Sequence, residues 1–146
     1  MRLSTRTRYG VRLMLDLAIK YGKGSVLLKD IAKSQDVSEK YLSQVIIPLR
    51  QAGLVTSVRG VHGGYSLSRE PNKINVKDIP EALEGDLSLV DCLTNPKVCK
   101  RMSLCATQEL WRDLNKVILD TLEKVSLQDL KKRADEKAQK TASYDI

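Results

Sequence analysis

The sequence predicts a mainly α-helical fold with one small β-hairpin. Two observations predict it: apolar residues recur at intervals of three and four over most of the chain, and a glycine-rich segment separates two short alternating stretches. Aromatic residues make up only 4% of the composition. With 146 residues, 42% of them hydrophobic, the chain is long enough to bury a core. That core must be built from Leu, Ile, Val and Ala.

Three helices are predicted in the first half. Residues 6–21 carry an apolar stripe wide enough to be mostly buried. Two further helices over residues 29–35 and 39–51 are joined by a short turn, in which Ser38 is a suitable N-cap for the second of them. Pro48 should bend the last turn of that helix. Its inward positions are Leu42, Val45, Ile46 and Leu49.

A hairpin follows the helix pair. Residues 54–58 and 65–68 alternate as short strands do, and the segment between them, Arg59 to Gly64, contains three glycines. A basic residue at the base of such a mobile hairpin is the layout of a DNA-binding wing, with Arg59 placed to enter the minor groove. Together with the helix pair, this predicts a winged helix-turn-helix.

The charge supports a nucleic-acid partner. Residues 1–76 carry 13 Lys and Arg against 5 Asp and Glu, whereas residues 77–146 carry 12 against 13. Such a surplus suits double-stranded DNA, although a merely soluble polar surface would also explain it. The residues that we expect to bind DNA lie on the outer face of the 39–51 helix and on the wing: Ser38, Lys40, Tyr41, Gln44, Arg50, Arg59 and Gly60.

The second half predicts a short helix over residues 76–83, a largely polar loop and a long helix from Leu104 onward, followed by a helix that begins after Ser126 and ends at about Gln139. The long helix has an apolar stripe that a small winged domain can cover only in part, so pairing with a second copy is expected; an intramolecular core helix is the alternative. The expected dimer interface comprises Leu104, Trp111, Leu114, Ile118, Leu122 and Val125. The expected division is a DNA-binding region over residues 1–76, a cysteine loop over residues 77–103 and a dimerisation region over residues 104–146.

All three cysteines fall within one short segment, as Cys92, Cys99 and Cys105. Their spacing, C-x6-C-x5-C, differs from that of zinc ribbons and of thioredoxin-like redox motifs. Three thiolates on a flexible loop beside a helix start can hold one soft metal centre, and nearby lysines and arginines favour the thiolate form. Unliganded thiols and a zinc site remain alternatives.

Several function classes are disfavoured. No apolar run approaches the roughly 20 residues of a membrane span, and no uncharged stretch near the start suits a signal peptide, so a reducing, cytoplasmic location is expected. The single histidine, His62, argues against most acid–base catalysis. We therefore expect no enzyme activity and no small-molecule substrate.

Several of these motifs together resemble the IscR-type winged-helix transcription regulators. The resemblance extends over about residues 1–135. It is carried by Leu3, Arg8-Tyr9, residues 38–45, residues 54–60, Gly63-Gly64-Tyr65, the three cysteines and residues 110–114. It implies a homodimeric bacterial regulator of a palindromic operator. It also implies an iron–sulfur cluster, [2Fe–2S] in particular, that is held by the cysteines and tunes DNA binding.

Two departures from the family pattern concern the fourth cluster ligand. In members that report on cluster supply, a histidine three residues after the last cysteine completes the ligation; here that position is Gln108, one helical turn from Cys105 and the first candidate. In nitric-oxide-sensing members an acidic residue of the other subunit ligates, where this chain has Arg8; Glu109 and Asp91 are the other candidates. Some members lack a cluster, so a repressor controlled by thiol oxidation or by a partner protein is the alternative.

Overall fold

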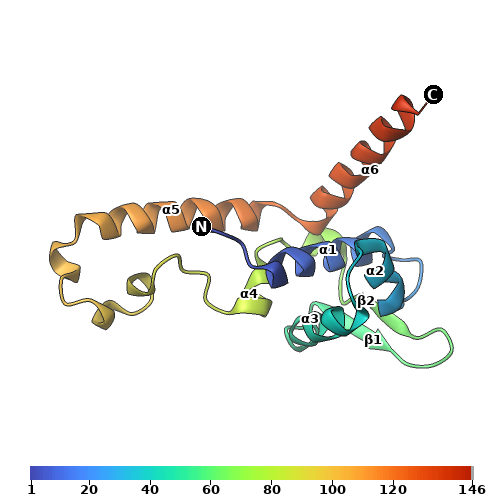
Figure 1. Cartoon of the computed structure of the whole chain (residues 1–146), viewed down its shortest axis with the longest axis horizontal. Helices are drawn as coiled ribbons and strands as arrows, with labels where there is room; N and C mark the ends of the chain where they lie inside the picture. Colours follow the sequence, from blue (N-terminus) through green and yellow to red (C-terminus); the bar gives the residue numbers. More distant parts are fainter. Residues whose placement is uncertain (146) are drawn as a thin grey trace.

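Six α-helices and one two-stranded antiparallel sheet follow each other along residues 1–145, which are the residues that this computed structural model describes (Figure 1). In chain order they are α1 (Thr5–Ile19), α2 (Leu28–Gln35), α3 (Glu39–Gln51), β1 (Val55–Val58), β2 (Gly64–Leu67), α4 (Asp78–Glu84), α5 (Ala106–Lys124) and α6 (Leu127–Tyr144). The predicted mainly α-helical fold with one small hairpin is confirmed.

Local signals set the ends of the first three helices. The Ser4 hydroxyl accepts a hydrogen bond from the backbone N–H of Thr7 at 2.9 Å and caps α1. Asp36 ends α2 in the left-handed conformation (φ 51°), which Asp tolerates better than most residues. Ser38 then caps α3 by accepting from the N–H of Tyr41 at 3.1 Å. The helix-turn-helix therefore follows from the residues at its turn.

One hydrophobic core joins these helices to the hairpin, α4 and the start of α6. It includes Leu13, Met14, Leu17, Ile31, Leu42, Val45, Ile46, Leu49, Leu67, Ile74, Ile79, Leu83 and Leu127. Leu127 is the first residue of α6 and has no exposed surface, and its N–H donates to the Ile74 carbonyl at 2.9 Å. The base of α6 is thus part of the winged core.

The hairpin pairs β1 with β2 from Val55 opposite Leu67 to Val58 opposite Gly64. Val26, in the segment before α2, forms an isolated antiparallel bridge with Tyr65. The apolar run at residues 26–28 therefore divides: its first residue joins the sheet and its last begins α2.

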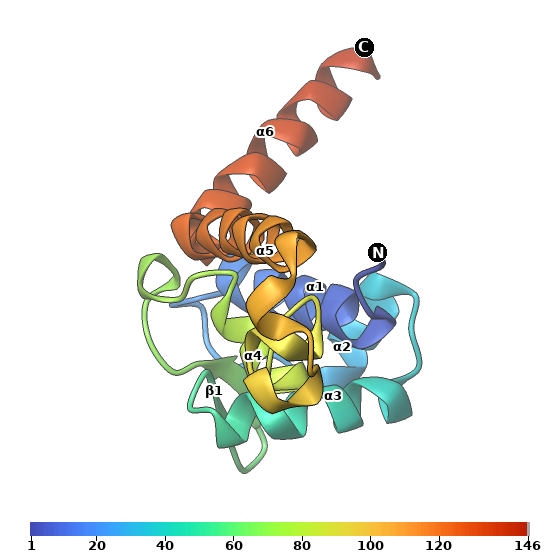
Figure 2. The ribbon, with the colours of Figure 1, turned by 90° about the vertical axis from the view of Figure 1, so that its left-hand side faces the viewer.

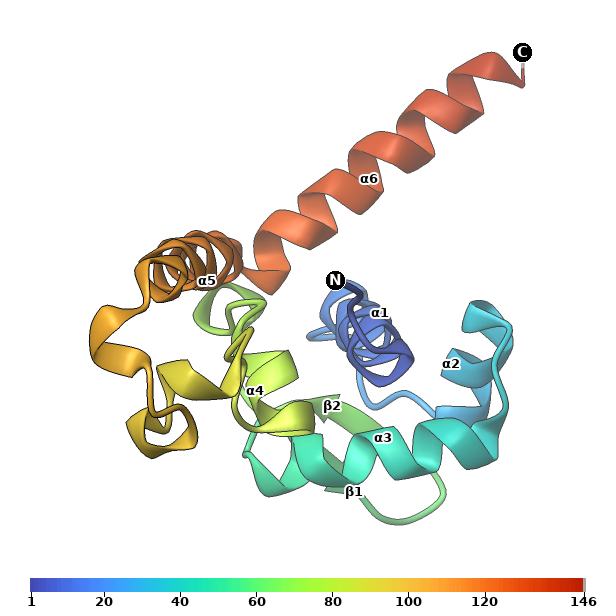
Figure 3. The ribbon, with the colours of Figure 1, turned by 60° about the vertical axis from the view of Figure 1, so that its left-hand side comes forward.

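Beyond the core, α5 runs out from the winged part and α6 projects away at an angle to it (Figures 1, 2 and 3). The end of α5 is tied back to the body, because the Val125 carbonyl accepts from the N–H of Val76 at 2.8 Å. The other end is reached through residues 86–105, which form three short 3-10 turns. None of the helices in residues 1–145 has the length and apolar content of a membrane span.

The predicted limits of the last two helices need correction. Leu104 lies in a 3-10 turn before α5 and Val125 lies just after it, because Cys105 and Val125 both have extended backbones. The predicted long helix is therefore wrong at its ends. In turn, α6 continues to Tyr144 instead of ending near Gln139. Its last turns are built mainly from good helix formers such as Ala, Lys and Gln, which extend a helix without an apolar stripe.

Candidate nucleic-acid interface and cysteine loop

The outward face of α3 presents polar side chains opposite its buried residues. Lys40, Gln44 and Arg50 are all exposed, as the sequence predicts. Ser38 is exposed as well, although its hydroxyl is engaged as the helix cap. These four residues place donors and acceptors along more than two turns of one helix. Such a face can meet base edges and phosphates together.

Tyr41 differs from the other predicted DNA-binding residues of α3. Its ring is half-buried and packs edge-on against Tyr9 of α1, with ring centroids 5.9 Å apart. The guanidinium of Arg12 lies 4.9 Å above the Tyr9 ring, and its Nε donates to the Gln35 side-chain oxygen at 2.6 Å. Tyr41 therefore helps to fix α3 on α1, and Arg12 joins α1 to α2.

Ile47 is an exposed residue of the same face that the sequence analysis passed over. Its side chain is 50% exposed, and it lies three residues after Gln44 and three before Arg50. The nearby Ser43 hydroxyl donates to the Lys40 carbonyl at 2.6 Å, within the helix itself. Helical spacing is the one sequence signal that indicates its exposure, because position 47 falls on the same side of α3 as positions 40, 44 and 51.

The wing continues this face beyond α3. Arg59 and Gly60 are exposed, and Gly60 has a φ of 113°, which only glycine adopts readily. Arg50 of α3 and Arg59 of the wing both line one open groove of about 270 Å³, together with Ser57, Val58, Gly64 and Tyr65. The helix face and the wing are thus parts of one basic surface.

The three cysteines lie on the loop before α5 and form no disulfide. Cys99 is exposed, and Cys92 and Cys105 are partly exposed. Within residues 1–145, no three side chains of His, Cys, Asp or Glu are grouped closely enough to hold a metal ion. The described loop therefore keeps the cysteines on one segment without converging their sulfurs.

Cys105 has the environment of a reactive thiol. Its sulfur lies 3.2 Å from the Thr107 hydroxyl, at the N-terminus of α5. Hydrogen bonds from that hydroxyl and from the Gln108 N–H, with a smaller contribution from the charge of Arg101, lower the pKa of the Cys105 thiol. The lowered pKa raises the fraction of thiolate at Cys105, and thiolate is the form that binds soft metals and reacts with oxidants.

Gln108, the predicted fourth ligand, is turned to another partner. Its side chain is only 7% exposed, and its oxygen accepts a hydrogen bond from Nη2 of Arg112 at 3.1 Å. The donor chemistry fits an iron–sulfur group at three positions, since thiolates are its usual ligands. At the fourth position the chain offers an amide that is already hydrogen-bonded.

The face of α5 that points away from the body carries exposed apolar side chains. Leu110 is 57% and Val117 is 62% exposed, and neither is among the expected interface residues. Of the predicted interface residues, Leu104 is 87% and Trp111 is 37% exposed. The others, Leu114, Ile118, Leu122 and Val125, are half-buried.

Comparison with known proteins shows which family the chain resembles. Residues 3–133 match the model of the Rrf2 family, described as iron-dependent transcriptional regulators. The transcriptional regulator CymR of Bacillus subtilis is 42% identical over 130 residues, which are 89% of each chain. Its solved structure, titled the global cysteine regulator, superposes with a TM-score of 0.78 at 40% identity, over 91% of this chain and 98% of that one.

A solved IscR from T. potens superposes with a TM-score of 0.77 at 43% identity, over 93% of this chain and 90% of that one. The resemblance to IscR-type regulators and the winged-helix fold are thus confirmed. These relatives are transcriptional regulators. The chain belongs to the Rrf2 family of DNA-binding transcription regulators.

Proposed function

We propose that this regulator acts in the cytoplasm as a homodimer that binds a palindromic operator in double-stranded DNA. Its affinity for the operator is set by an iron–sulfur cluster, [2Fe–2S] in particular, on the cysteine loop. The observation that carries the DNA-binding geometry is the single groove that Arg50 of α3 and Arg59 of the wing both line. A helix and a wing joined in this way can enter adjoining grooves of one duplex.

In this mode α3 lies in the major groove and the wing in the minor groove. Gln44 can pair with an adenine through its side-chain donor and acceptor, while Lys40 and Arg50 suit phosphates or guanines. Arg59 meets the strongly negative potential of a narrow minor groove, and Gly60 lets the backbone approach closely. Ser38 and Tyr41 keep α3 in place through its cap and its packing on α1.

The apolar face of α5 supports the dimer. Leu110 and Val117 of α5, and Leu104 in the 3-10 turn before it, are each more than half exposed, and α5 stands out from the winged body (Figure 1). Burying such side chains against a second copy stabilises the pair by about 1.5–3 kcal/mol per fully buried residue. Two-fold pairing would present two α3 helices to half-sites about one DNA turn, or a multiple of it, apart.

In the cluster-bound form Cys92, Cys99 and Cys105 supply three thiolates, and Gln108 is the first candidate for the fourth position. To ligate, Gln108 must leave Arg112, whose hydrogen bond it accepts. An amide is a weaker iron ligand than a thiolate or an imidazole. A cluster bound in this way would be lost easily under oxidants or iron shortage. Such easy loss suits a sensor.

A cluster-free regulator controlled by thiol oxidation is the second candidate, and the environment of Cys105 favours it. The hydrogen bond with the Thr107 hydroxyl is the largest cause of the lowered pKa of the Cys105 thiol. Because the pKa is lowered, a larger fraction of Cys105 is thiolate at neutral pH. Thiolates are the form that peroxides oxidise. In this case the cysteine loop senses oxidants directly.

The visible absorption spectrum of anaerobically purified protein, measured with its iron and sulfide content, separates the two candidates. The cluster proposal predicts a coloured protein that contains both elements and loses its colour in Cys92→Ser, Cys99→Ser and Cys105→Ser variants. Colourless protein after anaerobic reconstitution, with DNA binding that responds to peroxide through Cys105, would instead support the second candidate. Salt-independent binding, or none to any genomic promoter fragment, would refute both.

A further inference from the structure

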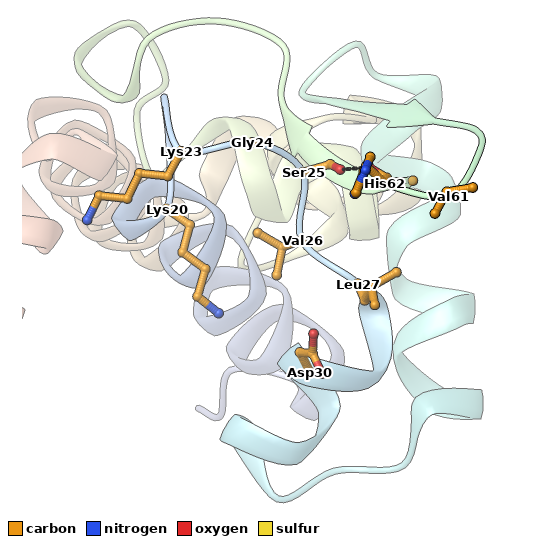
Figure 4. A pocket seen from close by; sticks show the side chains of 10 residues that line it. Lys20, Lys23, Gly24, Ser25, Val26, Leu27, Asp30, Val61 and His62 are labelled. Atoms are coloured by element: carbon orange, nitrogen blue, oxygen red, sulfur yellow. Dashed lines mark hydrogen bonds between the residues drawn. The ribbon is translucent and has the colours of Figure 1, made fainter.

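The wing is joined to the segment before α2 by three hydrogen bonds. The N–H of Val26 donates to the Tyr65 carbonyl, and the N–H of Tyr65 donates to the Val26 carbonyl, both at 2.8 Å. One residue earlier, the Ser25 hydroxyl donates to the His62 carbonyl at 2.6 Å (Figure 4). The first two bonds hold the base of the wing, and the third reaches its tip.

The tip, residues 59–63, has few other restraints. Pairing between β1 and β2 ends at Val58 and Gly64, and within the tip the N–H of Gly63 donates to the Gly60 carbonyl at 2.9 Å. Val61 is 97% exposed. Within residues 1–145, Ser25 is the one residue whose side chain hydrogen-bonds to the tip. Its hydroxyl therefore fixes the tip relative to the body.

Close backbone packing makes the pose of the wing specific. A Cβ on Gly64 would lie 2.5 Å from the Val26 carbonyl oxygen, and a Cβ on Gly63 would lie 2.6 Å from the Val58 carbonyl oxygen. Neither backbone atom can move aside as a flexible side chain could. At Gly64 the wing thus sits against Val26 as closely as glycine allows, while Gly63 packs closely within the hairpin itself. This close fit lies next to Ser25, whose hydroxyl reaches the His62 carbonyl.

We infer that Ser25 is a positioning residue for DNA binding, which holds the wing tip in the pose that sends Arg59 into the minor groove. This inference rests on the proposed function. Ser25 acts on DNA binding through Arg59, because the tight turn of residues 60–63, which contains His62, begins directly after Arg59. Without the hydroxyl the tip samples more poses, so a smaller fraction of molecules is ready to bind. The net worth of one such hydrogen bond corresponds to about a two- to tenfold loss of affinity.

The test compares Ser25→Ala with Ser25→Thr, which keeps a hydroxyl, on a duplex that the wild-type protein selects from a random-sequence library. Fluorescence anisotropy should show binding that is about two- to tenfold weaker for Ser25→Ala and close to wild type for Ser25→Thr. Hydrogen exchange should rise at the amides of the tip alone. In an Arg59→Ala background, Ser25→Ala should cause no further loss.

Wild-type affinity in Ser25→Ala, or an undiminished loss in the Arg59→Ala background, would overturn the inference. Exchange that rises throughout the protein would also overturn it, because Ser25 would then act on general stability. Failure of the proposed function has a separate signature, since Arg59→Ala itself would then bind the duplex as well as the wild type. Weaker binding by Arg59→Ala with unchanged binding by Ser25→Ala rejects the positioning role alone.

Discussion

The guanidinium of Arg112 donates a hydrogen bond to the side-chain oxygen of Gln108 across one turn of α5, at 3.1 Å. Gln108 is buried beside the cysteine loop, three residues after Cys105. The side chain proposed as the fourth ligand is thus held by a cation on its own helix. A cluster on this loop should therefore be weakly held at one position.

Gln108→Ile or another apolar change would disturb packing, so Gln108→His gives the sharper test of this weakness. An imidazole is a good iron ligand and should slow the loss of cluster absorbance in air by about tenfold or more. Arg112→Ala is the matched control, since it frees the amide without improving the donor. Equal rates of loss in wild type and Gln108→His would contradict a ligand role for position 108.

Gln44→Ala should weaken binding to the selected duplex by about 1–3 kcal/mol and relax the preference at one base pair. The physical reason is the loss of a paired donor and acceptor on the exposed face of α3. Gln139→Ala removes the same side chain from an exposed part of α6, away from α3 and the wing, and should change little. Titrations against duplexes substituted at each position would show the effect, and equal losses in both variants would argue against base reading by Gln44.

The helix-turn-helix was predictable because its signals are local. Ser38 caps α3, and Asp36 tolerates the left-handed conformation of the turn. Both ends of the turn are therefore determined by residues within the turn itself. The contacts that position the outward face of α3 are not local. Tyr41 packs on Tyr9, which lies 32 residues earlier, and no sequence period reports such a pairing.

The start of α5 was mispredicted for a related reason. Leu104 stands seven residues before Trp111 and so fits a helical apolar repeat, yet the backbone at Cys105 is extended and the helix begins at Ala106. The hydrogen bond from Ser25 to His62 spans 37 residues and has no sequence signature either. The spacing of the cysteines shows that all three lie on one segment, but it does not show whether their sulfurs come close enough together to share one metal centre.

Leu110→Glu should shift the protein from dimer to monomer at micromolar concentration. This side chain is 57% exposed on the outward face of α5, where a carboxylate would have to be buried without a partner in the dimer. Gln139→Glu, which adds the same charge on an exposed part of α6, should leave the dimer intact. Sedimentation equilibrium measures both variants. A monomeric wild type, or a dimeric Leu110→Glu variant, would count against pairing along α5.

The stability of α6 should depend on pH through Asp129. The backbone N–H of Ser126 donates to this carboxylate at 2.8 Å and the Ser126 hydroxyl donates to it at 2.9 Å, and these bonds lower the pKa of Asp129 in the folded protein. A carboxyl whose folded pKa lies below its unfolded value contributes stability above the unfolded pKa of about 3.9 and loses it as pH falls through the folded value. Asp129→Asn should therefore unfold at a lower temperature than wild type at pH 7, with the difference closing below about pH 3.9.

Thermal unfolding followed by circular dichroism gives the comparison, with Asp135→Asn on the exposed part of α6 as the control. A gap between Asp129→Asn and wild type that stays constant down to acid pH would mean that the cap does not depend on the charge of Asp129.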